Sequence, residues 1–551
     1  MEMRKVVESV ATITFFTIIL TSTSIQAAGF NQHSKRWWEK APTDFGEHRQ
    51  HLLQAHSWKL FGFGKPLKAP ADTTIDRRPN QPSGERQLLA RGLQSEFVAR
   101  NVAFEGDMIA FWPNDLNYTH LIVCIEQGRE ENSGDPAIDG ENPSIQRINV
   151  TPGPDYGKVE TILYGMDRCD GIRTTPWGTV LATEETDDGG AYEIIDPLGT
   201  TNHWIADRGA AGAPADIRDG INSSNPSSAV VKRTALPAMA WEGLAILHNG
   251  VVIAGDELRP ELDKDGGAIF RFVPSAFYNC TGAPVRPDQL CDNTIADLQE
   301  SPLVSGQNYA LATLCDEFED FGQGCEAGRG VWIEVGAATA REDANQRGAT
   351  GYCRPEDLHV DPGYGVFVGG EGIRWYWNNT CGAGTGETLR AVGNQMDAQG
   401  AIFSEVFGYN LLSGNGTDPA DVRITRFVGS DSRMFSPDNL DIQPFTKNVY
   451  VIEDHEFGEI WACLPDGGDR DGRTDGCVAM LSINSSTAEP TGFIFDGTGK
   501  VAFYIVQHGQ GAAIIDFESN PVCEDDNPDD CNGYTDDLIK ITGFKVKKAL
   551  H

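Results

Sequence analysis

The sequence predicts an all-β protein, a six-bladed β-propeller with long, disulfide-stapled loop insertions, and two observations support this prediction. From about residue 90, short apolar alternations are broken by Gly, Pro, Asn and Asp, and the 551 residues include 61 Gly and 29 Pro. Long amphipathic helical stretches are scarce, which is typical of short strands joined by turns. A divergent repeat also recurs along the chain, as it does in radially repeated β-sheet folds.

The charge balance excludes several classes of partner. The chain has 80 acidic and 44 basic side chains, for a formal net charge of −36. Nucleic acids and anionic membrane surfaces bind proteins through clustered Lys and Arg, so we expect neither as a partner. We expect a monomer whose clustered carboxylates bind hard cations such as Ca²⁺.

Residues 1–27 have the features of a Sec-type signal peptide. Two basic residues precede a short apolar stretch, and the small residue Ala27 marks the expected cleavage site. No later segment has 18 consecutive apolar residues, so we expect no membrane span. We therefore expect a periplasmic or extracellular protein, with an irregular N-terminal arm over 28–90 and a β-propeller catalytic domain over 91–551.

The 12 cysteines of an exported chain are expected to form disulfides that staple its loops. The pairs at short spacing are Cys280 with Cys291, Cys315 with Cys325, Cys463 with Cys477, and Cys523 with Cys531. Paired Cys-x-x-Cys knuckles, which a zinc site would need, do not occur in the sequence. Cys169 has no other cysteine close to it in the sequence, so it is available for another role.

The repeat consists of a turn residue, a short strand and then carboxylates. Its copies lie at 178–185, 250–257, 365–372 and 448–455, with a weaker fifth copy at 498–508. Three of these copies are preceded by a segment that has an acidic residue near its start, at 241–246, 354–360 and 436–442. The intervals between copies are irregular, so we expect long insertions between blades, around 275–345 and 375–425.

The carboxylates of the repeat recur in pairs at a nearly constant spacing. The pairs are Glu242 with Asp256, Glu356 with Glu371, and Asp438 with Glu453. The innermost strands of a propeller line its central channel, so equivalent carboxylates converge there. Such carboxylates repel one another unless protons or cations neutralise them, which predicts a site for two or more Ca²⁺ ions. For each residue alone, capping of a turn is the alternative.

Several segments of the chain resemble the PhoX-type alkaline phosphatases, which are exported bacterial propellers. They are the Thr-Pro-Trp-Gly-Thr stretch with its two Glu at 175–185, the Lys-Arg-Thr-Ala-Leu and Glu-Gly segments within 231–243, the Arg-Pro-Glu at 354–356, and the blade motifs at 436–440 and 507–509. The likeness runs from about residue 90 to 545. Signatures of serine nucleophiles, zinc peptidases and P-loops do not occur in the sequence.

The resemblance implies a metal-dependent hydrolase of phosphate monoesters, with a small phosphorylated organic substrate and a cluster of calcium and iron in the channel. It implies that Glu242 and Glu356 bridge metals and that Arg354 binds the phosphoryl group, so these three residues form the expected catalytic set. Arg173 is expected as a second substrate-binding residue. The full expected metal set is Glu184, Glu185, Glu242, Asp256, Glu257, Glu356, Asp438, Glu453 and Cys169.

Two departures from the family pattern bear on the metal and on the activity. Thr183 replaces a family cysteine, and Trp241 stands where a His precedes Glu-Gly in the family. If the lost thiolate is the one that binds iron, the site is all-calcium. Two alternatives stay open: a calcium-dependent propeller esterase, lactonase or phosphodiesterase, and a non-catalytic propeller binding protein with structural metals. Arg354 favours a phosphate ester, because a neutral lactone needs no guanidinium.

Overall fold

The structure, a computed structural model, describes residues 46–129, 142–259, 266–282, 290–315, 328–361, 373–381, 387–393, 422–430, 433–465, 476–508 and 535–546. All of them belong to one compact unit, Ala41–Ala549. Its α-helices are α1 (Gly46–Ala55), α2 (Ser57–Leu60) and α3 (Ala340–Arg347), and short 3₁₀ turns lie at Ser83–Glu85, Leu298–Glu300 and Pro302–Val304. None of the described helices is long and apolar enough to cross a membrane.

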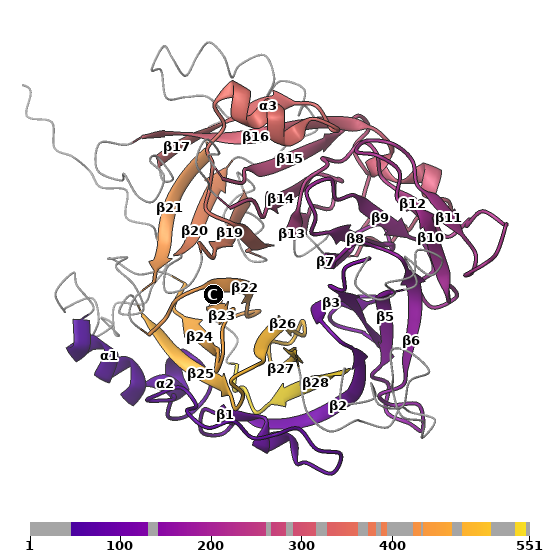
Figure 1. Ribbon diagram of the computed structural model, residues 1–551. Helices are drawn as coiled ribbons and strands as arrows, with labels where there is room; N and C mark the ends of the chain where they lie inside the picture. Colours follow the sequence, from indigo (N-terminus) through magenta and orange to yellow (C-terminus); the bar gives the residue numbers. More distant parts are fainter. Residues whose placement is uncertain are drawn as a thin grey trace, which may run out of the picture. The chain divides into compact units, whose positions relative to one another are not determined.

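Six innermost strands form a closed ring around a central axis (Figure 1). They are β3 (Gly106–Trp112), β7 (Cys169–Thr174), β13 (Trp241–Ile246), β18 (Pro355–Val360), β22 (Pro437–Ile442) and β26 (Glu489–Phe495). Each contacts the next, and β26 contacts β3. The predicted all-β propeller is therefore confirmed.

Three of the five sheets begin on β3, β7 and β22. The first continues with β4 (His120–Ile125), β5 (Pro143–Asn149), β6 (Val159–Tyr164), β10 (His203–Asp207) and β11 (Asp216–Arg218). The second continues with β8 (Val180–Glu184), β9 (Ala191–Ile194) and β12 (Val230–Lys232). The third continues with β23 (Val449–Glu453), β24 (Glu459–Cys463), β25 (Cys477–Ile483) and β1 (Gln87–Leu89), which comes from the N-terminal part of the chain.

The number of sheets differs from the six separate blades that we expected. A nine-stranded sheet contains two of the innermost strands, β13 and β18. The pairing of β17 with β21 joins the two blades that begin on these strands into one sheet. Its other strands are β14 (Val252–Asp256), β15 (Ile269–Pro274), β16 (Gly306–Cys315), β17 (Gly328–Val335), β21 (Val422–Gly429), β20 (Glu387–Gly393) and β19 (Ile373–Asn379). The result is five hydrogen-bonded sheets around six inner hairpins.

The fifth sheet closes the ring by joining the two ends of the propeller. It consists of β26, β27 (Val501–Gln507), β28 (Thr535–Thr542) and β2 (Gln94–Ala103), which pairs antiparallel with β28. Beside this junction, the buried carboxylate of Asp537 forms ion pairs with Arg77, Arg86 and Arg100. These contacts hold together segments from the two ends of the propeller sequence.

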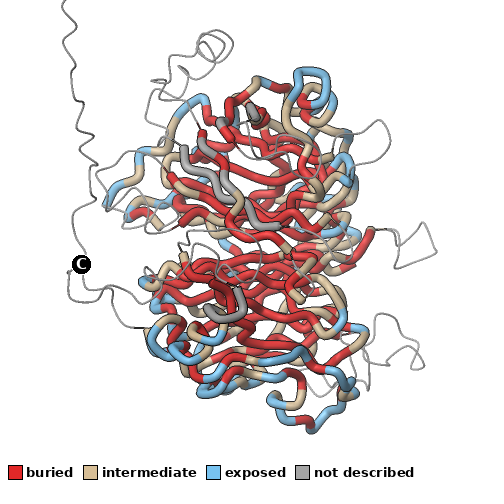
Figure 2. The backbone as a smooth tube through the Cα atoms, turned by 90° about the vertical axis from the view of Figure 1, so that its left-hand side faces the viewer, coloured by how far each residue is buried: buried red, intermediate tan, exposed pale blue. Residues whose placement is uncertain are grey.

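Apolar side chains of neighbouring sheets form the core between them. One cluster includes Leu181 of the second sheet with Leu244 and Phe270 of the nine-stranded sheet. Another joins Phe503 of the fifth sheet to Leu121 of the first. Figure 2 shows buried residues through the interior of the molecule and exposed residues mainly at its periphery. Each sheet therefore buries its faces against its neighbours, which positions the innermost strands rigidly.

Four disulfides lie within the described residues. The expected pairs Cys280–Cys291 and Cys463–Cys477 are present. Two further bonds, Cys124–Cys169 and Cys353–Cys381, were not expected. Cys325, Cys523 and Cys531 lie outside the described residues, so the remaining two expected pairs stay predictions.

Candidate metal centre in the channel

All six inner hairpins carry a register shift at the same place. In each hairpin, the regular pairing is interrupted near the start of the innermost strand. Between the two residue pairs that flank the interruption, the innermost strand advances by three residues and its partner strand by two. Such a β-bulge bends the strand and turns a side chain out of the regular alternation. The residues at the bulge are Asp107, Asp170, Glu242, Glu356, Asp438 and Gly492.

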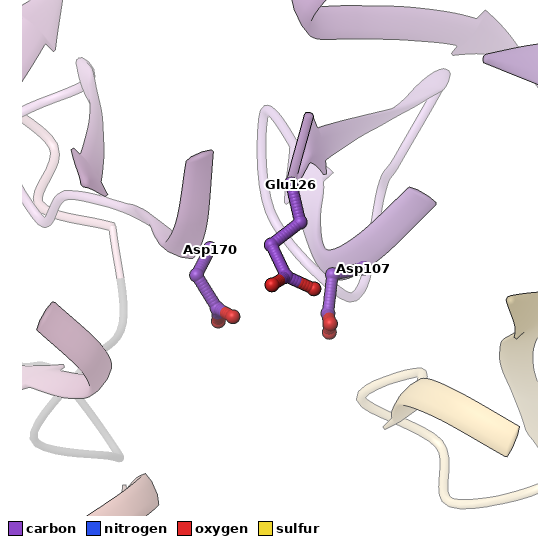
Figure 3. A group of neighbouring side chains, drawn as sticks. All are labelled: Asp107, Glu126 and Asp170. Atoms are coloured by element: carbon purple, nitrogen blue, oxygen red, sulfur yellow. The ribbon is translucent and has the colours of Figure 1, made fainter. Parts of the chain in front are cut away.

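The five bulge carboxylates form overlapping groups suited to cations, together with Glu126 and Glu185, which directly follow β4 and β8. The groups are Asp107, Glu126 and Asp170; Asp170, Glu185 and Glu242; and Glu242, Glu356 and Asp438, and within each group one ligand atom per residue lies within 4.8 Å of the others. In Figure 3, the carboxyl groups of Asp107, Glu126 and Asp170 point toward a common space. Asp170 and Glu242 each belong to two groups, so the candidate sites form a continuous chain.

Burial makes these carboxylates difficult to ionise without a counter-charge. Burial and the nearby Glu126 raise the pKa of Asp107 to about 8. Burial likewise raises the pKa of Glu356 to about 8, although Arg354 opposes the shift. The pKa values of Asp170 and Glu242 are raised well above their ordinary range, first by burial and then by neighbouring carboxylates. A bound cation would remove this cost by replacing the protons.

The donor set fits a hard cation. Asp170 is 2% exposed, and its Oδ1 atom has no hydrogen-bond partner within the described part of the chain. A buried carboxylate oxygen without a partner is costly unless an ion or water completes its coordination. The three groups contain only carboxylate oxygens, which are the ligands that Ca²⁺ prefers.

Some of the expected metal ligands are members of these carboxylate groups, and others are not. Glu185, Glu242, Glu356 and Asp438 belong to them. Glu257 lies close by, because its carboxylate forms an ion pair with Arg354. Asp107, Glu126 and Asp170 were not expected from the sequence. The spacing from Asp170 to Glu185 equals that of the repeat pair Glu356 and Glu371, and it was the available signal for Asp170.

Glu184, Asp256 and Glu453 were expected as ligands, but the structure gives each of them other partners. Glu184 accepts hydrogen bonds from the backbone N–H groups of Asp167 and Gly190, and it forms an ion pair with Arg208 at 2.8 Å. Asp256 forms an ion pair with Arg341 at 2.6 Å. Glu184 thus holds the segments that carry Asp167 and Arg208 at the end of β8, and Asp256 holds α3 at the end of β14.

Glu453 has the same kind of environment as Glu184 and Asp256. It accepts hydrogen bonds from the backbone N–H groups of Phe435 and Glu459, at 3.0 and 2.8 Å, and it contacts His455 at 3.0 Å. The residue that follows each of these three carboxylates, namely Glu185, Glu257 and Asp454, lies on the side of the bulge carboxylates. Successive side chains of a strand point in opposite directions, which explains the division.

The structure corrects the expectation that Cys169 is a metal ligand. Its sulfur is bonded to that of Cys124, and a disulfide sulfur is not a thiolate. Thr183, which replaces the family cysteine, is buried and donates a hydrogen bond to the backbone carbonyl of Gly171 at 3.0 Å. Trp241 is fully buried and donates to the carbonyl of Pro237. Iron bound through a thiolate of Cys169 therefore does not fit this site.

The two expected arginines lie in different parts of the channel. Arg354 contacts Glu257 and lies 3.2 Å from Glu356, so it borders the carboxylate groups. Arg173 lies farther along β7 and donates to Asp357 at 2.7 Å and to His359 at 2.6 Å. It lines a cavity of about 120 Å³ whose walls also include His359 and Asp441. Glu371, the partner of Glu356 in the sequence repeat, lies outside the described residues.

Comparison with known proteins decides the family. A family model described as alkaline phosphatase PhoX matches residues 168–510, more than half of the chain. The chain belongs to the PhoX family. The PhoX match includes β7, β13, β18 and β22, which together carry four of the five bulge carboxylates. No curated protein matches the sequence.

Solved structures share only a distant likeness with this member of the PhoX family. One is a protein described as a gluconolactonase, with 10% identity over 84% of this chain and 97% of that chain, and a TM-score of 0.36. Another is the PQQ-bound aldose sugar dehydrogenase of Streptomyces coelicolor, with 10% identity over 82% of this chain and 98% of that chain, and a TM-score of 0.34. We draw no functional argument from either likeness.

Proposed function

We propose that the protein is an exported, calcium-dependent phosphatase that hydrolyses small phosphate monoesters in the propeller channel. The observation that carries this proposal is the position of Arg354 beside the chain of buried carboxylates. A phosphate monoester needs positive charge around its phosphoryl oxygens, and an acidic channel supplies it only through bound cations and a fixed guanidinium. The disulfides support export, because such bonds persist in oxidising compartments.

The residues of this chain have distinct roles in the proposed reaction. The carboxylates of Asp107, Asp170, Glu242 and Glu356 would hold the cations. When bound, the cations supply charge that neutralises the phosphoryl oxygens and favours an oxygen nucleophile. Arg354 binds and orients the phosphoryl group, since a planar guanidinium matches two phosphate oxygens. Its ion pairs with Glu257 and Glu356 fix that guanidinium beside the carboxylates that would hold the cations, before substrate arrives.

The first test is the substitution Arg354→Ala. We expect kcat/KM for p-nitrophenyl phosphate to fall by at least about 100-fold, which is typical of the loss of one preorganised donor to developing charge. The fold should survive, although loss of the ion pairs with Glu257 and Glu356 should lower the melting temperature. The control is Arg347→Ala, which removes a half-exposed arginine of α3 and should leave kcat/KM unchanged. Normal hydrolysis of p-nitrophenyl phosphate by Arg354→Ala would contradict the role of Arg354.

The second test is removal of the cation. Incubation with EGTA, followed by desalting, should abolish hydrolysis of p-nitrophenyl phosphate, and added Ca²⁺ should restore it, because the buried carboxylates cannot bind a phosphate without counter-charge. Elemental analysis of the active protein should find calcium. Full activity in the presence of EGTA would contradict the calcium site.

A further inference from the structure

The disulfide between Cys124 and Cys169 joins two residues that adjoin the first candidate cation group in the sequence. Cys124 is on β4, two residues before Glu126, and Cys169 is on β7, immediately before Asp170. Both cysteines are fully buried. The bond joins the first and second sheets, so it links the backbones that present two of the three carboxylates of this group.

The other described disulfides lack this arrangement. Cys463 and Cys477 face each other on the paired strands β24 and β25. Cys353 and Cys381 flank the ends of the paired strands β18 and β19, and Cys280 and Cys291 lie in one connection. Among the described residues, Cys124–Cys169 is therefore the disulfide that joins two sheets, and it does so at the carboxylates.

Non-covalent contacts hold this carboxylate group only in part. Glu126 accepts a hydrogen bond from Gln507 at 3.0 Å and forms an ion pair with Arg168 at 3.4 Å. Asp107 accepts hydrogen bonds from Thr491 and, at 3.3 Å, from Gln507. The Oδ1 atom of Asp170 has no hydrogen-bond partner within the described residues. Three carboxylates whose oxygens lie within 4.8 Å repel one another when ionised, and the repulsion acts to separate the strands that carry them. A covalent link between those strands opposes the separation.

We propose that the Cys124–Cys169 disulfide is a positioning element that holds Glu126 and Asp170 at ligand distance before a cation binds. The inference rests on the proposed function only in that it takes this group to bind Ca²⁺. Because the ligands are held in place, the cation does not have to draw two sheets together. The same bond keeps the sulfur of Cys169 out of the donor set, so the group binds its cation through oxygen alone.

The test compares calcium binding by two matched double variants. Cys124→Ala/Cys169→Ala removes the bond between sheets, and Cys463→Ala/Cys477→Ala removes an equally buried bond far from the carboxylates. Calcium affinity is measured by isothermal titration calorimetry on EGTA-treated, desalted protein, and melting temperature is measured without cation. We expect the first variant to bind Ca²⁺ about 10–100-fold more weakly, as is typical of the loss of a group that orients metal ligands. The control should keep the affinity of the unaltered protein.

Several results would overturn the proposal. They are an unchanged calcium affinity in the first variant, an equal loss in both variants, and an unaltered protein that binds no Ca²⁺. If the first variant does not fold, peptide mapping of the unreduced, unaltered protein by mass spectrometry tests the proposal instead. Free thiols at Cys124 and Cys169 in that protein would overturn the proposal. If calcium affinity falls in the first variant alone, the proposal is supported even when the protein hydrolyses no phosphate ester. A lack of phosphate ester hydrolysis would contradict the proposed function and not this proposal.

Discussion

Neighbouring acidic residues of this chain have opposite roles, and the alternation of the strand separates them. Glu184 pairs with Arg208, whereas Glu185, the next residue, lies beside Asp170 and Glu242. Asp256 pairs with Arg341, whereas Glu257 lies at Arg354. Glu184 therefore has a fixed protein cation, whereas Glu185 is available for a cation from solution. In the second pair both carboxylates have an arginine partner, and Glu257 is the one that borders the bulge carboxylates.

This division predicts different outcomes for two aspartates that are both almost fully buried. Asp170→Asn removes a ligand, so calcium affinity should fall at least about tenfold. The stability of the cation-free protein should not fall, because a repelling charge is lost. Asp256→Asn removes the carboxylate that Arg341 binds, so the free energy of unfolding should fall by about 2 kcal/mol while calcium affinity is retained. Calorimetric titration and urea unfolding of both variants check these expectations, and a retained calcium affinity in Asp170→Asn would contradict them.

At the scale of the elements, the bulge at the start of each innermost strand is the device that builds the site. Five bulges carry a carboxylate, and the sixth carries Gly492, whose φ is 60°. A Cβ atom at Gly492 would clash with the backbone carbonyl of Asp107. Glycine at this bulge therefore lets β26 approach the strand that presents Asp107.

The substitution Gly492→Ala tests this account of the sixth bulge. The unfavourable φ and the clash should lower the free energy of unfolding by about 1–3 kcal/mol. Because the strain acts on the backbone of Asp107, calcium affinity should fall as well. Gly348→Ala is the control, since Gly348 also has a positive φ, of 79°, but has open space around its Cβ position. That variant should lose stability and keep its calcium affinity. If Gly492→Ala lost stability alone, the link to Asp107 would be wrong.

The sequence predicts the features that recur at constant spacing, and it does not predict residues or bonds that lie outside that spacing. The repeat predicted a propeller and found Glu242, Glu356 and Asp438, because spacing along a regular hairpin reports position in space. It did not find Asp107, because a longer turn separates that residue from Glu126 and breaks the common spacing. Spacing also could not separate Glu184 from Glu185, because the arginine that pairs with Glu184 and the carboxylates that lie beside Glu185 come from other strands or connections. The bond of Cys169 to Cys124 joins two sheets, so no local pattern signals it.

At the scale of the whole molecule, the raised pKa values of the buried carboxylates predict a stability that depends on pH and, if they bind calcium as proposed, on calcium as well. Asp107 and Glu356 have folded-state pKa values of about 8, above the values of the unfolded chain. Between about pH 4 and pH 8, the folded protein therefore retains protons that the unfolded chain has lost, and stability falls as the pH rises through this interval.

Scanning calorimetry checks this dependence directly. The melting temperature of the EGTA-treated protein should fall between pH 5 and pH 8.5, and added Ca²⁺ should restore most of the loss at pH 8.5. The same expectation predicts that calcium binding releases protons near pH 7. A cation-free melting temperature that rises over this range would contradict the raised pKa values.

The junction of β2 with β28 sets the time at which the metal centre can form during biosynthesis. All of the bulge carboxylates leave the ribosome before Thr535–Thr542, the segment that β2 needs as its partner. The backbone N–H of Gly106, next to Asp107, donates to Asp536 in that last strand. The arrangement around Asp107 is thus complete only when the end of the propeller has been synthesised. If the carboxylate groups bind cations as proposed, loading is therefore a late event, and the compartment in which the finished chain closes its ring supplies the metal.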